Sequence, residues 1–508
     1  MTLTHFHLFC GIGGGAMGFQ QASPRIPGVQ GQYRCLGGID SDPACIRDFS
    51  RLTGTPGTVM DLFDREQYTD WHGHEPPAGW REATPADVLR AAGGEYPDVV
   101  FTSPPCKGYS GLLPEKSSKT AKYQAMNRLA LRGIWLTLEA FADDPPAFVI
   151  LENVPRIATR GHHLLDQIVG LLRHYGFAAA ETVHDCGHLG GLAQSRKRFL
   201  LVARHLEKVP AYLYQPVRKP LRTIGEVIGS LPVPIGPQAN PMHRVPALSW
   251  RTWVRLAMIP PGGDWRSLRD LRVEDGVLRD YAILATPRDD HLGVNRMDDT
   301  IGTVTGKSGT TNGAFSIADP RVWSDGKASY QTGGNFGICP WDGAAGSVTG
   351  SACHDNGPWS IADPRVALGD KSHGHYGVAD MDQPAHAVTG TATHRNGWWS
   401  IADPRLFPTP EDRGVFVIRA LHGGAWHRPL TTLELAALQG FDLTEPLDGT
   451  SDTRWRMAIG NAVPPPAARA VAEVIGRAIL LARAGETFVL GSTPIWVRQM
   501  AACVGLSQ

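Results

Sequence analysis

The chain has 508 residues, of which 42% are hydrophobic and 19% charged, and its 49 basic and 49 acidic residues give a formal net charge of zero. This length allows two domains, and the absence of any apolar run near the roughly 20 residues that cross a bilayer excludes a transmembrane helix. A zero net charge neither favours nor excludes a nucleic-acid partner, because such binding depends on local basic surface.

The first 200 residues or so alternate short apolar runs with helical stretches. The pattern predicts strands at 5–10, 33–39, 99–102, 148–152 and 199–203, with helices between them at 44–52 and 123–141. Strands that alternate with helices are typical of an α/β fold. We therefore expect a doubly wound, Rossmann-like domain with a mixed, mostly parallel sheet.

From about residue 210 to 410 the chain is rich in Gly, Pro, Thr, Asp and Trp and contains an internal repeat. Each copy reads Val-Thr-Gly, then Asn-Gly, then Ser-Ile-Ala-Asp-Pro-Arg, and the copies begin at Val304, Val348 and Val388. Three turn-rich copies favour serially placed elements, which we interpret as duplicated parts of a recognition domain. A propeller-like array is the alternative.

The regular pattern returns after about residue 414, with a strand expected at 415–419 and helices at 431–439 and 467–484. Thr431 and Glu434 have the spacing of a capping box at the start of the first of these helices. The sequence thus predicts one α/β domain in two parts, 1–215 and 411–508, split by a turn-rich insertion at 216–410.

Eight cysteines are scattered along the chain and form no CxxC pair. This spacing predicts neither a zinc site nor a redox dithiol, so we expect no metal. Unpaired thiols in a chain of this size are typical of a reducing cytoplasm. The N-terminal sequence passes at once into a predicted strand and a glycine turn, which leaves little room for a removable leader. We expect a cytoplasmic protein, associated with the nucleoid if its partner is DNA.

A glycine-rich turn, Gly11 to Gly15, follows the first predicted strand. Glycine lets the backbone approach a ligand closely, and such a turn lies at the carboxyl ends of the strands, where cofactors bind. Asp40 ends the next predicted strand, close to the spacing at which an acid meets a ribose hydroxyl, and Asp61 ends a third short segment. Glycine turn, acid and acid in this order favour a nucleoside-bearing cofactor, and no phosphate loop of the ATP-binding type is present.

Cys106 follows Pro104 and Pro105 at the end of a buried predicted strand and precedes Lys107. A neighbouring positive charge favours the thiolate, so this position suits a nucleophile. Glu152 ends another apolar strand, where a carboxyl group is partly dry and suited to acid–base work.

Two arginines precede the strand at 199–203. Arg196 and Arg198 are two residues apart, so they can share one face of an extended segment. Two guanidinium groups directed into a cleft suit a phosphate or a carbonyl oxygen.

Six motifs in this order, FCGIGGG, PPC, ENV, QSRKR, RPLTTLELAALQGF and GNAVP, resemble those of the DNA cytosine-C5 methyltransferase family. The resemblance covers about 5–205 and 415–480. It implies an S-adenosylmethionine-dependent enzyme that flips a cytosine out of double-stranded DNA and methylates C5.

The same resemblance implies roles for individual residues. Cys106 attacks C6 of cytosine, Glu152 holds N3 and the exocyclic amine, and Arg198 meets the base carbonyl with Arg196 in support. In the cofactor site, Asp40 binds the ribose hydroxyls and Asp61 the adenine amino group. The remaining expected S-adenosyl-L-methionine contacts are Phe9, Gly11, Gly13, Gly14 and Asn461.

Two positions depart from the family pattern. Lys107 stands where the family usually has Gln. One interpretation is that Lys107 contacts a phosphate or is a tolerated variation. The other is that Lys107 alters the pocket so that it accepts a carboxylated methyl group on the sulfonium. His7 stands where the family often has Asp. Two further alternatives are an RNA cytosine-C5 methyltransferase and a catalytically silent DNA-binding protein.

Target recognition is expected within 216–410, where the Asn-Gly pairs begin at Asn312, Asn356 and Asn396. Asn can read adenine in the major groove, but Asn-Gly is first a turn signal. The sequence predicts neither the DNA target nor the biological role: a restriction–modification partner, a phage-encoded protective enzyme and a solitary bacterial regulator look alike here. No coiled-coil signal is present, so a monomer is expected.

Overall fold

The computed structural model describes residues 1–105, 120–210, 216–232, 239–244 and 430–485, together with 234, 384, 385, 388 and the backbone of short strands between 273 and 429. The chain divides into two compact units. The first comprises 1–246, 379–403 and 429–508, and the second comprises 247–378 and 404–428.

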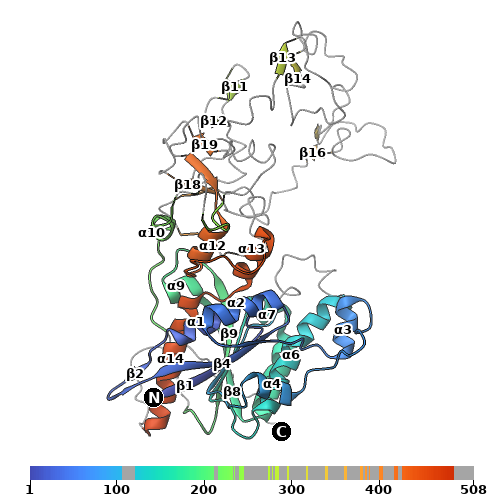
Figure 1. Cartoon of the computed structure of the whole chain (residues 1–508), viewed down its shortest axis with the longest axis vertical. Helices are drawn as coiled ribbons and strands as arrows, with labels where there is room; N and C mark the ends of the chain where they lie inside the picture. The colour runs from blue at the N-terminus through green and yellow to red at the C-terminus, as the bar shows by residue number, and fades with distance from the viewer. Residues whose placement is uncertain are drawn as a thin grey trace, which may run out of the picture. The chain divides into compact units, whose positions relative to one another are not determined.

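A seven-stranded sheet is the centre of the first unit (Figure 1), with the strand order β5-β4-β1-β6-β7-β9-β8. All neighbours are parallel except β9, which runs antiparallel to both β7 and β8. The predicted fold class, a mixed and mostly parallel α/β sheet, is confirmed. The strands are β1 (Thr2–Leu8), β4 (Gln32–Asp40), β5 (Gly57–Val59), β6 (Val99–Thr102), β7 (Phe148–Asn153), β8 (Phe177–Asp185) and β9 (Lys197–His205).

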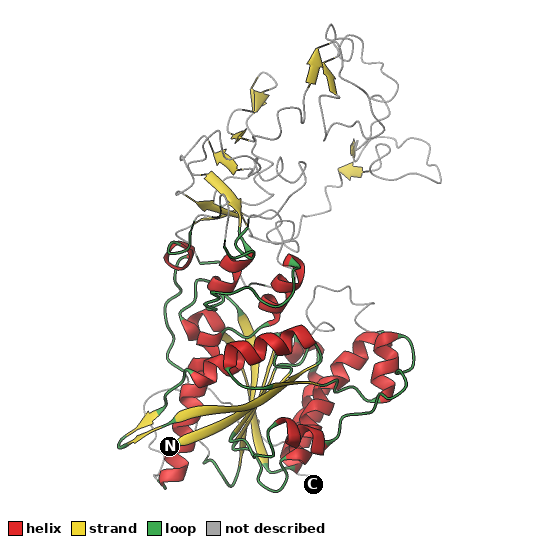
Figure 2. Cartoon of the chain, in the orientation of Figure 1, coloured by secondary structure: helices red, strands yellow, loops and turns green. Residues whose placement is uncertain are grey.

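Helices cover both faces of this sheet (Figure 2), because consecutive residues of a strand point to opposite sides. Val100 of β6 belongs to the core shared with α4, α6 and α8, whereas Val99 and Phe101 belong to the core shared with α1 and α14. These helices are α1 (Gly14–Gln20), α4 (Pro85–Ala91), α6 (Ala121–Ala140), α8 (His162–His174) and α14 (Pro465–Ala484).

The remaining elements of the first unit are short. A third hydrophobic cluster joins α10 (Ile224–Ile228), α12 (Thr432–Leu438) and α13 (Asp452–Asn461) with Ala385 and Val388. The capping box predicted for Thr431 and Glu434 is present at the start of α12. The others are β2 (Arg25–Ile26), β3 (Val29–Gln30), α2 (Pro43–Thr53), α3 (Arg65–His72), α7 (Ile157–Arg160), α9 (Cys186–Gly190), β17 (Val378–Asp380) and β18 (Ser400–Asp403).

The second unit contains short strand pairs that follow the sequence repeat. The Ser-Ile-Ala residues of the first copy form β14 (Ser316–Ala318), which pairs in parallel with β13 (Val294–Arg296), a strand that precedes the copy. The Ser-Ile-Ala residues of the second copy form β16 (Ser360–Ala362), which pairs in the matching register with β15 (Ile338–Pro340), a strand that precedes that copy. The unit also contains antiparallel pairs formed by β10 (Val273–Glu274), β11 (Val277–Leu278), β12 (Tyr281–Leu284), β19 (Val417–Ala420) and β20 (Trp426–Pro429).

Most predicted elements lie within a few residues of the observed ones, and β8 was missed because its run of Ala, Glu and Thr lacks a strong strand pattern. Within the described residues, no helix combines the length and the apolar character that a membrane span requires. The domain boundaries at residues 215 and 410 remain predictions.

Candidate active site

A cavity of about 450 Å³ lies at the carboxyl ends of β1, β4, β6 and β7. β1 is paired with β4 on one side and β6 on the other, so the chain connections diverge at β1. In a doubly wound sheet such a divergence leaves a crevice that binds ligands. The volume is in the range of about 300–1,000 Å³ that small-molecule sites occupy.

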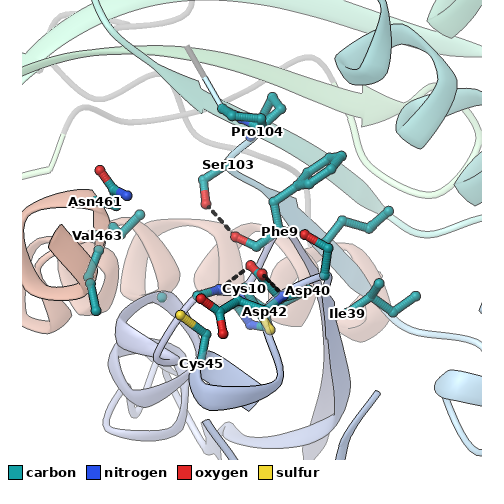
Figure 3. A pocket seen from close by; sticks show the side chains of 18 of the residues that line it. Phe9, Cys10, Ile39, Asp40, Asp42, Cys45, Ser103, Pro104, Asn461 and Val463 are labelled. Atoms are coloured by element: carbon teal, nitrogen blue, oxygen red, sulfur yellow. Dashed lines mark hydrogen bonds between the residues drawn. The ribbon is translucent and has the colours of Figure 1, made fainter. Parts of the chain in front are cut away.

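The turn after β1 forms one wall of the cavity. Phe9 has a φ of 53°, the only positive φ at a non-glycine position among the described residues, and Gly11 follows with a φ of 52°. Two bonds hold this strained turn: the Cys10 N–H donates to the carbonyl of Ile39 over 3.0 Å, and the Ser103 hydroxyl donates to the carbonyl of Phe9 over 3.1 Å (Figure 3). A side chain at Gly11 would meet no protein atom within 4 Å, so the backbone there is open to a ligand.

Asp40 is held at the cavity by the turn itself. Its carboxylate accepts the N–H groups of Gly11 at 2.9 Å and Asp42 at 3.0 Å (Figure 3). Burial raises the pKa of Asp40, and the two backbone donors oppose that shift. The carboxylate is thus oriented before any ligand arrives.

Gly13 and Gly14, two of the predicted cofactor contacts, do not line this cavity. Gly13 has a φ of 89° and packs against Phe49 and Thr53 of α2. A Cβ at Gly14 would lie 2.1 Å from the carbonyl oxygen of Val463. The structure therefore gives both glycines a packing role around the cavity.

Asp61 lines the cavity next to a set of apolar side chains. Its carboxylate accepts the N–H of Phe63 at 3.0 Å, which orients the acid at the end of its segment. The sequence analysis missed the apolar lining, although bulky residues directly after a strand-end acid are a readable signal. These lining residues include Met60, Leu62, Phe63, Trp71, Met126, Leu129 and Trp455.

Glu152 and Arg198 form an ion pair at the far part of the cavity lining, with 2.9 Å between Oε1 and Nε. β7 and β9 place them there, because the two strands are antiparallel neighbours. Their side chains are 10% and 15% exposed. An ion pair that is this well shielded, yet borders a cavity, suits recognition of a polar planar ligand.

Arg196 also lines the cavity, but its guanidinium is 2% exposed and bonds to main-chain carbonyls. Nη2 donates to Gly460 over 3.0 Å and to Ala462 over 3.2 Å, and Nη1 donates to the carbonyl of Val388. Arg196 thus contacts the two residues that flank Asn461. Asn461 is exposed at the end of α13 and faces the cavity (Figure 3).

Cys106 and Lys107 lie outside the described residues, as do Asn312, Asn356 and Asn396. Pro104 and Pro105, which directly precede Cys106, line the cavity. The described cysteines are unsuited to nucleophilic attack, because burial raises the pKa of each thiol, for example to about 11 at Cys35 and Cys186.

His5 and His7 form a buried histidine pair, of which His7 lines the cavity. Nδ1 of His5 and Nε2 of His7 are 2.7 Å apart, and both rings pack on Phe19. Burial lowers the pKa of His7 to about 3 and holds that of His5 well below its usual range, with the neighbouring His7 adding to the shift at His5. Together with Cys35, these residues bring three potential metal-ligand atoms within 4.8 Å. Because the rings bond to each other, we describe them as a neutral pair, and the expectation of no metal remains a prediction.

This pair predicts a pH-dependent stability. In the unfolded chain a histidine binds a proton near pH 6.5, whereas folded His7 does so only near pH 3. The unfolded state therefore binds more protons in that window. The free energy of unfolding should fall by about 1.4 kcal/mol per pH unit for each such group as the pH decreases.

Denaturant unfolding at several pH values checks this expectation. The His7→Asn variant should show a shallower slope between pH 7 and 5 than the wild type, whereas His163→Ala, at an exposed position, should not. Equal slopes in wild type and His7→Asn would contradict the assignment of a neutral buried pair.

Comparison with known proteins gives one family match. Residues 3–234 match the model of the C-5 cytosine-specific DNA methylase family. This match confirms the resemblance predicted from the motif order. No curated protein matches the chain significantly.

Three solved structures illustrate the similarity. A methyltransferase of Entamoeba histolytica is 11% identical, covers 94% of this chain and 98% of its own, and has a TM-score of 0.48. A putative DNA modification methyltransferase encoded within an E. coli prophage is 13% identical, with coverages of 94% and 99% and a TM-score of 0.44. The S. pombe Dnmt2 methyltransferase is 14% identical, with coverages of 95% and 99% and a TM-score of 0.41.

Proposed function

Because residues 3–234 match the model of the C-5 cytosine-specific DNA methylase family, we propose that the protein methylates C5 of cytosine in double-stranded DNA with S-adenosyl-L-methionine as the donor. One observation supports this proposal above the others. The Glu152–Arg198 ion pair borders the same cavity as Asp40, Asp61 and the turn after β1. A nucleoside-binding region and a base-binding region therefore share one cavity.

The cavity residues fit S-adenosylmethionine. The open backbone at Gly11, the oriented carboxylate of Asp40 and the apolar walls beside Asp61 suit a methionine chain, a ribose and an adenine ring respectively. Phe9 and Asn461 would complete the site, whereas Gly13 and Gly14 would support it from behind. When bound, S-adenosylmethionine supplies an electrophilic methyl group.

Asp40→Asn should weaken binding of S-adenosylhomocysteine by roughly ten- to a hundred-fold, because it removes a hydrogen-bonded charge from a partly dry site. Titration calorimetry measures this affinity. Asp64→Asn, at the N-cap of α3, is the matched control and should leave the affinity unchanged. Since burial raises the pKa of Asp40, wild-type affinity should also fall on acidification. Equal affinities for wild type and Asp40→Asn would exclude Asp40 from the cofactor site.

Three further residues, Cys106, Glu152 and Arg198, act on the base. Cytosine is flipped out of the duplex into the cavity, since C5 and C6 are hidden in the stack. The Cys106 thiolate adds to C6, and this addition makes C5 electron-rich, while Glu152 holds N3 and the exocyclic amine. Arg198 orients Glu152 and meets the base carbonyl. After C5 is alkylated, loss of its proton and of the Cys106 sulfur restores the aromatic ring.

We also propose the remaining organisation of the protein. The region 216–410 reads the target sequence, 1–215 and 411–508 form the catalytic domain, and the chain works as a cytoplasmic monomer on DNA. A role in restriction–modification or in phage protection follows from this activity only in the appropriate host.

Nucleoside mass spectrometry of DNA from cells that express the wild type or Cys106→Ala tests the proposed reaction. A C5-modified cytosine in the wild type alone is expected, because Cys106 forms the bond that activates C5. The mass of the product distinguishes a methyl from a carboxylated group, for which Lys107→Gln is the informative second variant. Modified RNA with unmodified DNA, or no modified base at all, would overturn the proposal.

A further inference from the structure

The residues Gln194, Ser195 and Arg196, here called the QSR segment, bind the third sequence repeat through its main chain. The Ser195 N–H donates to the carbonyl of Ala385 over 2.9 Å. The Val388 N–H donates to Oε1 of Gln194 over 3.0 Å, and the Val388 carbonyl accepts from Arg196. Val388 is the first residue of the third Val-Thr-Gly copy, so the start of this copy is hydrogen-bonded to the QSR segment.

The opposite side of the QSR segment binds the elements that return after the insertion. Gln194 Nε2 donates to the carbonyl of Leu438 at the end of α12 over 3.2 Å. Arg196 donates to the carbonyls of Gly460 and Ala462, on either side of Asn461 in the cavity wall. One guanidinium therefore bonds both to the third repeat and to the loop that borders the cavity.

This junction is dry and firmly oriented. Gln194 is 0% exposed and Arg196 is 2% exposed. Asp185 fixes the segment from beneath, since its carboxylate accepts the Ser195 hydroxyl at 2.6 Å and the Arg196 N–H at 2.9 Å. A buried guanidinium that loses a carbonyl partner pays a large desolvation cost. The carbonyls of Gly460, Ala462 and Val388 therefore share one buried guanidinium as their donor.

We propose that Arg196 and Gln194 are positioning residues that couple cofactor binding to the placement of the third repeat. The inference rests on the proposed function, because it takes the cavity to be the cofactor site. Binding beside Asn461 tightens the loop carbonyls on Arg196, which in turn holds Ala385 and Val388 in place.

Hydrogen exchange of the full chain, with and without S-adenosylhomocysteine, tests this coupling. In the wild type the ligand should slow exchange both in 455–464, the end of α13 with the loop that follows it, and in the segment 384–390, with an effect of about five-fold or more at the second site. In Arg196→Lys the loop should remain protected, whereas protection at 384–390 should be lost, because an ammonium cannot span the three carbonyls. Gln194→Met should give the same loss with the Arg196 bonds intact.

Arg204→Lys is the matched control. Arg204 lies on β9, the strand that Arg196 directly precedes, and it also donates to a main-chain carbonyl, that of Val209 at 2.7 Å. The Arg204→Lys substitution should leave the ligand-dependent protection at both sites unchanged. If the ligand protects 455–464 but not 384–390 in the wild type, the coupling is wrong and the cofactor assignment stands. Equal protection at 384–390 in the wild type and all variants would have the same meaning. No ligand-dependent protection anywhere would instead overturn the cofactor assignment on which the coupling depends.

Discussion

Glu152→Gln is expected to slow single-turnover methyl transfer by about 10²–10⁴-fold, the range over which a positioned acid–base group contributes to rate. The amide preserves the shape of the side chain but carries no negative charge. It leaves the Arg198 guanidinium, now 2.9 Å from Oε1, without its counter-ion and removes the group that would hold N3 of the base. Transfer of a radiolabelled methyl group into DNA measures the loss.

A surface ion pair supplies the control for this experiment. Glu95 pairs with Arg34 at 2.5 Å, with both side chains 51% exposed, and neither residue lines the cavity. Glu95→Gln should transfer methyl groups at the wild-type rate, because exposed pairs contribute little and this one is remote from the site. A Glu152→Gln rate within a few-fold of the wild type would remove Glu152 from the chemistry.

Gly14→Ala is expected to abolish measurable cofactor binding and to lower the free energy of unfolding by about 1–3 kcal/mol or more, as overpacking does. The new Cβ would lie 2.1 Å from the carbonyl oxygen of Val463 and 2.8 Å from Cζ of Phe441. Main chain cannot move aside as a flexible side chain can, so the loop after α13 must shift. That loop directly follows Asn461, the last residue of α13, which borders the cavity.

Gly54→Ala separates this steric effect from simple backbone strain. Gly54 ends α2 with a φ of 66°, and a Cβ there would meet nothing within 4 Å. Its substitution should cost only about 1 kcal/mol of left-handed strain and leave S-adenosylhomocysteine affinity unchanged. Thermal melting and calorimetry measure both quantities. Normal cofactor affinity in Gly14→Ala would show that the contact with Val463 does not shape the site.

The cavity-lining acids were predictable because Asp40 ends β4 and Asp61 lies two residues beyond the end of β5. Asp40 and Asp61 follow apolar segments, and parallel strands bring their carboxyl ends to one edge of the sheet. Glu152 and Arg198 were predictable for the same reason, since each borders a strongly apolar strand. Local pattern was therefore enough to identify these four charged side chains, but not the apolar lining beside Asp61.

The sequence by itself determined the order of motifs, the strand–helix alternation and the acids at the strand ends, because these depend on neighbouring residues. Only the tertiary structure decided that Gly14 packs on Val463 and that Arg196 bonds to Val388, Gly460 and Ala462. These partners lie hundreds of residues apart along the chain. Their contacts arise from packing and from the need to satisfy a buried guanidinium, which no local spacing encodes.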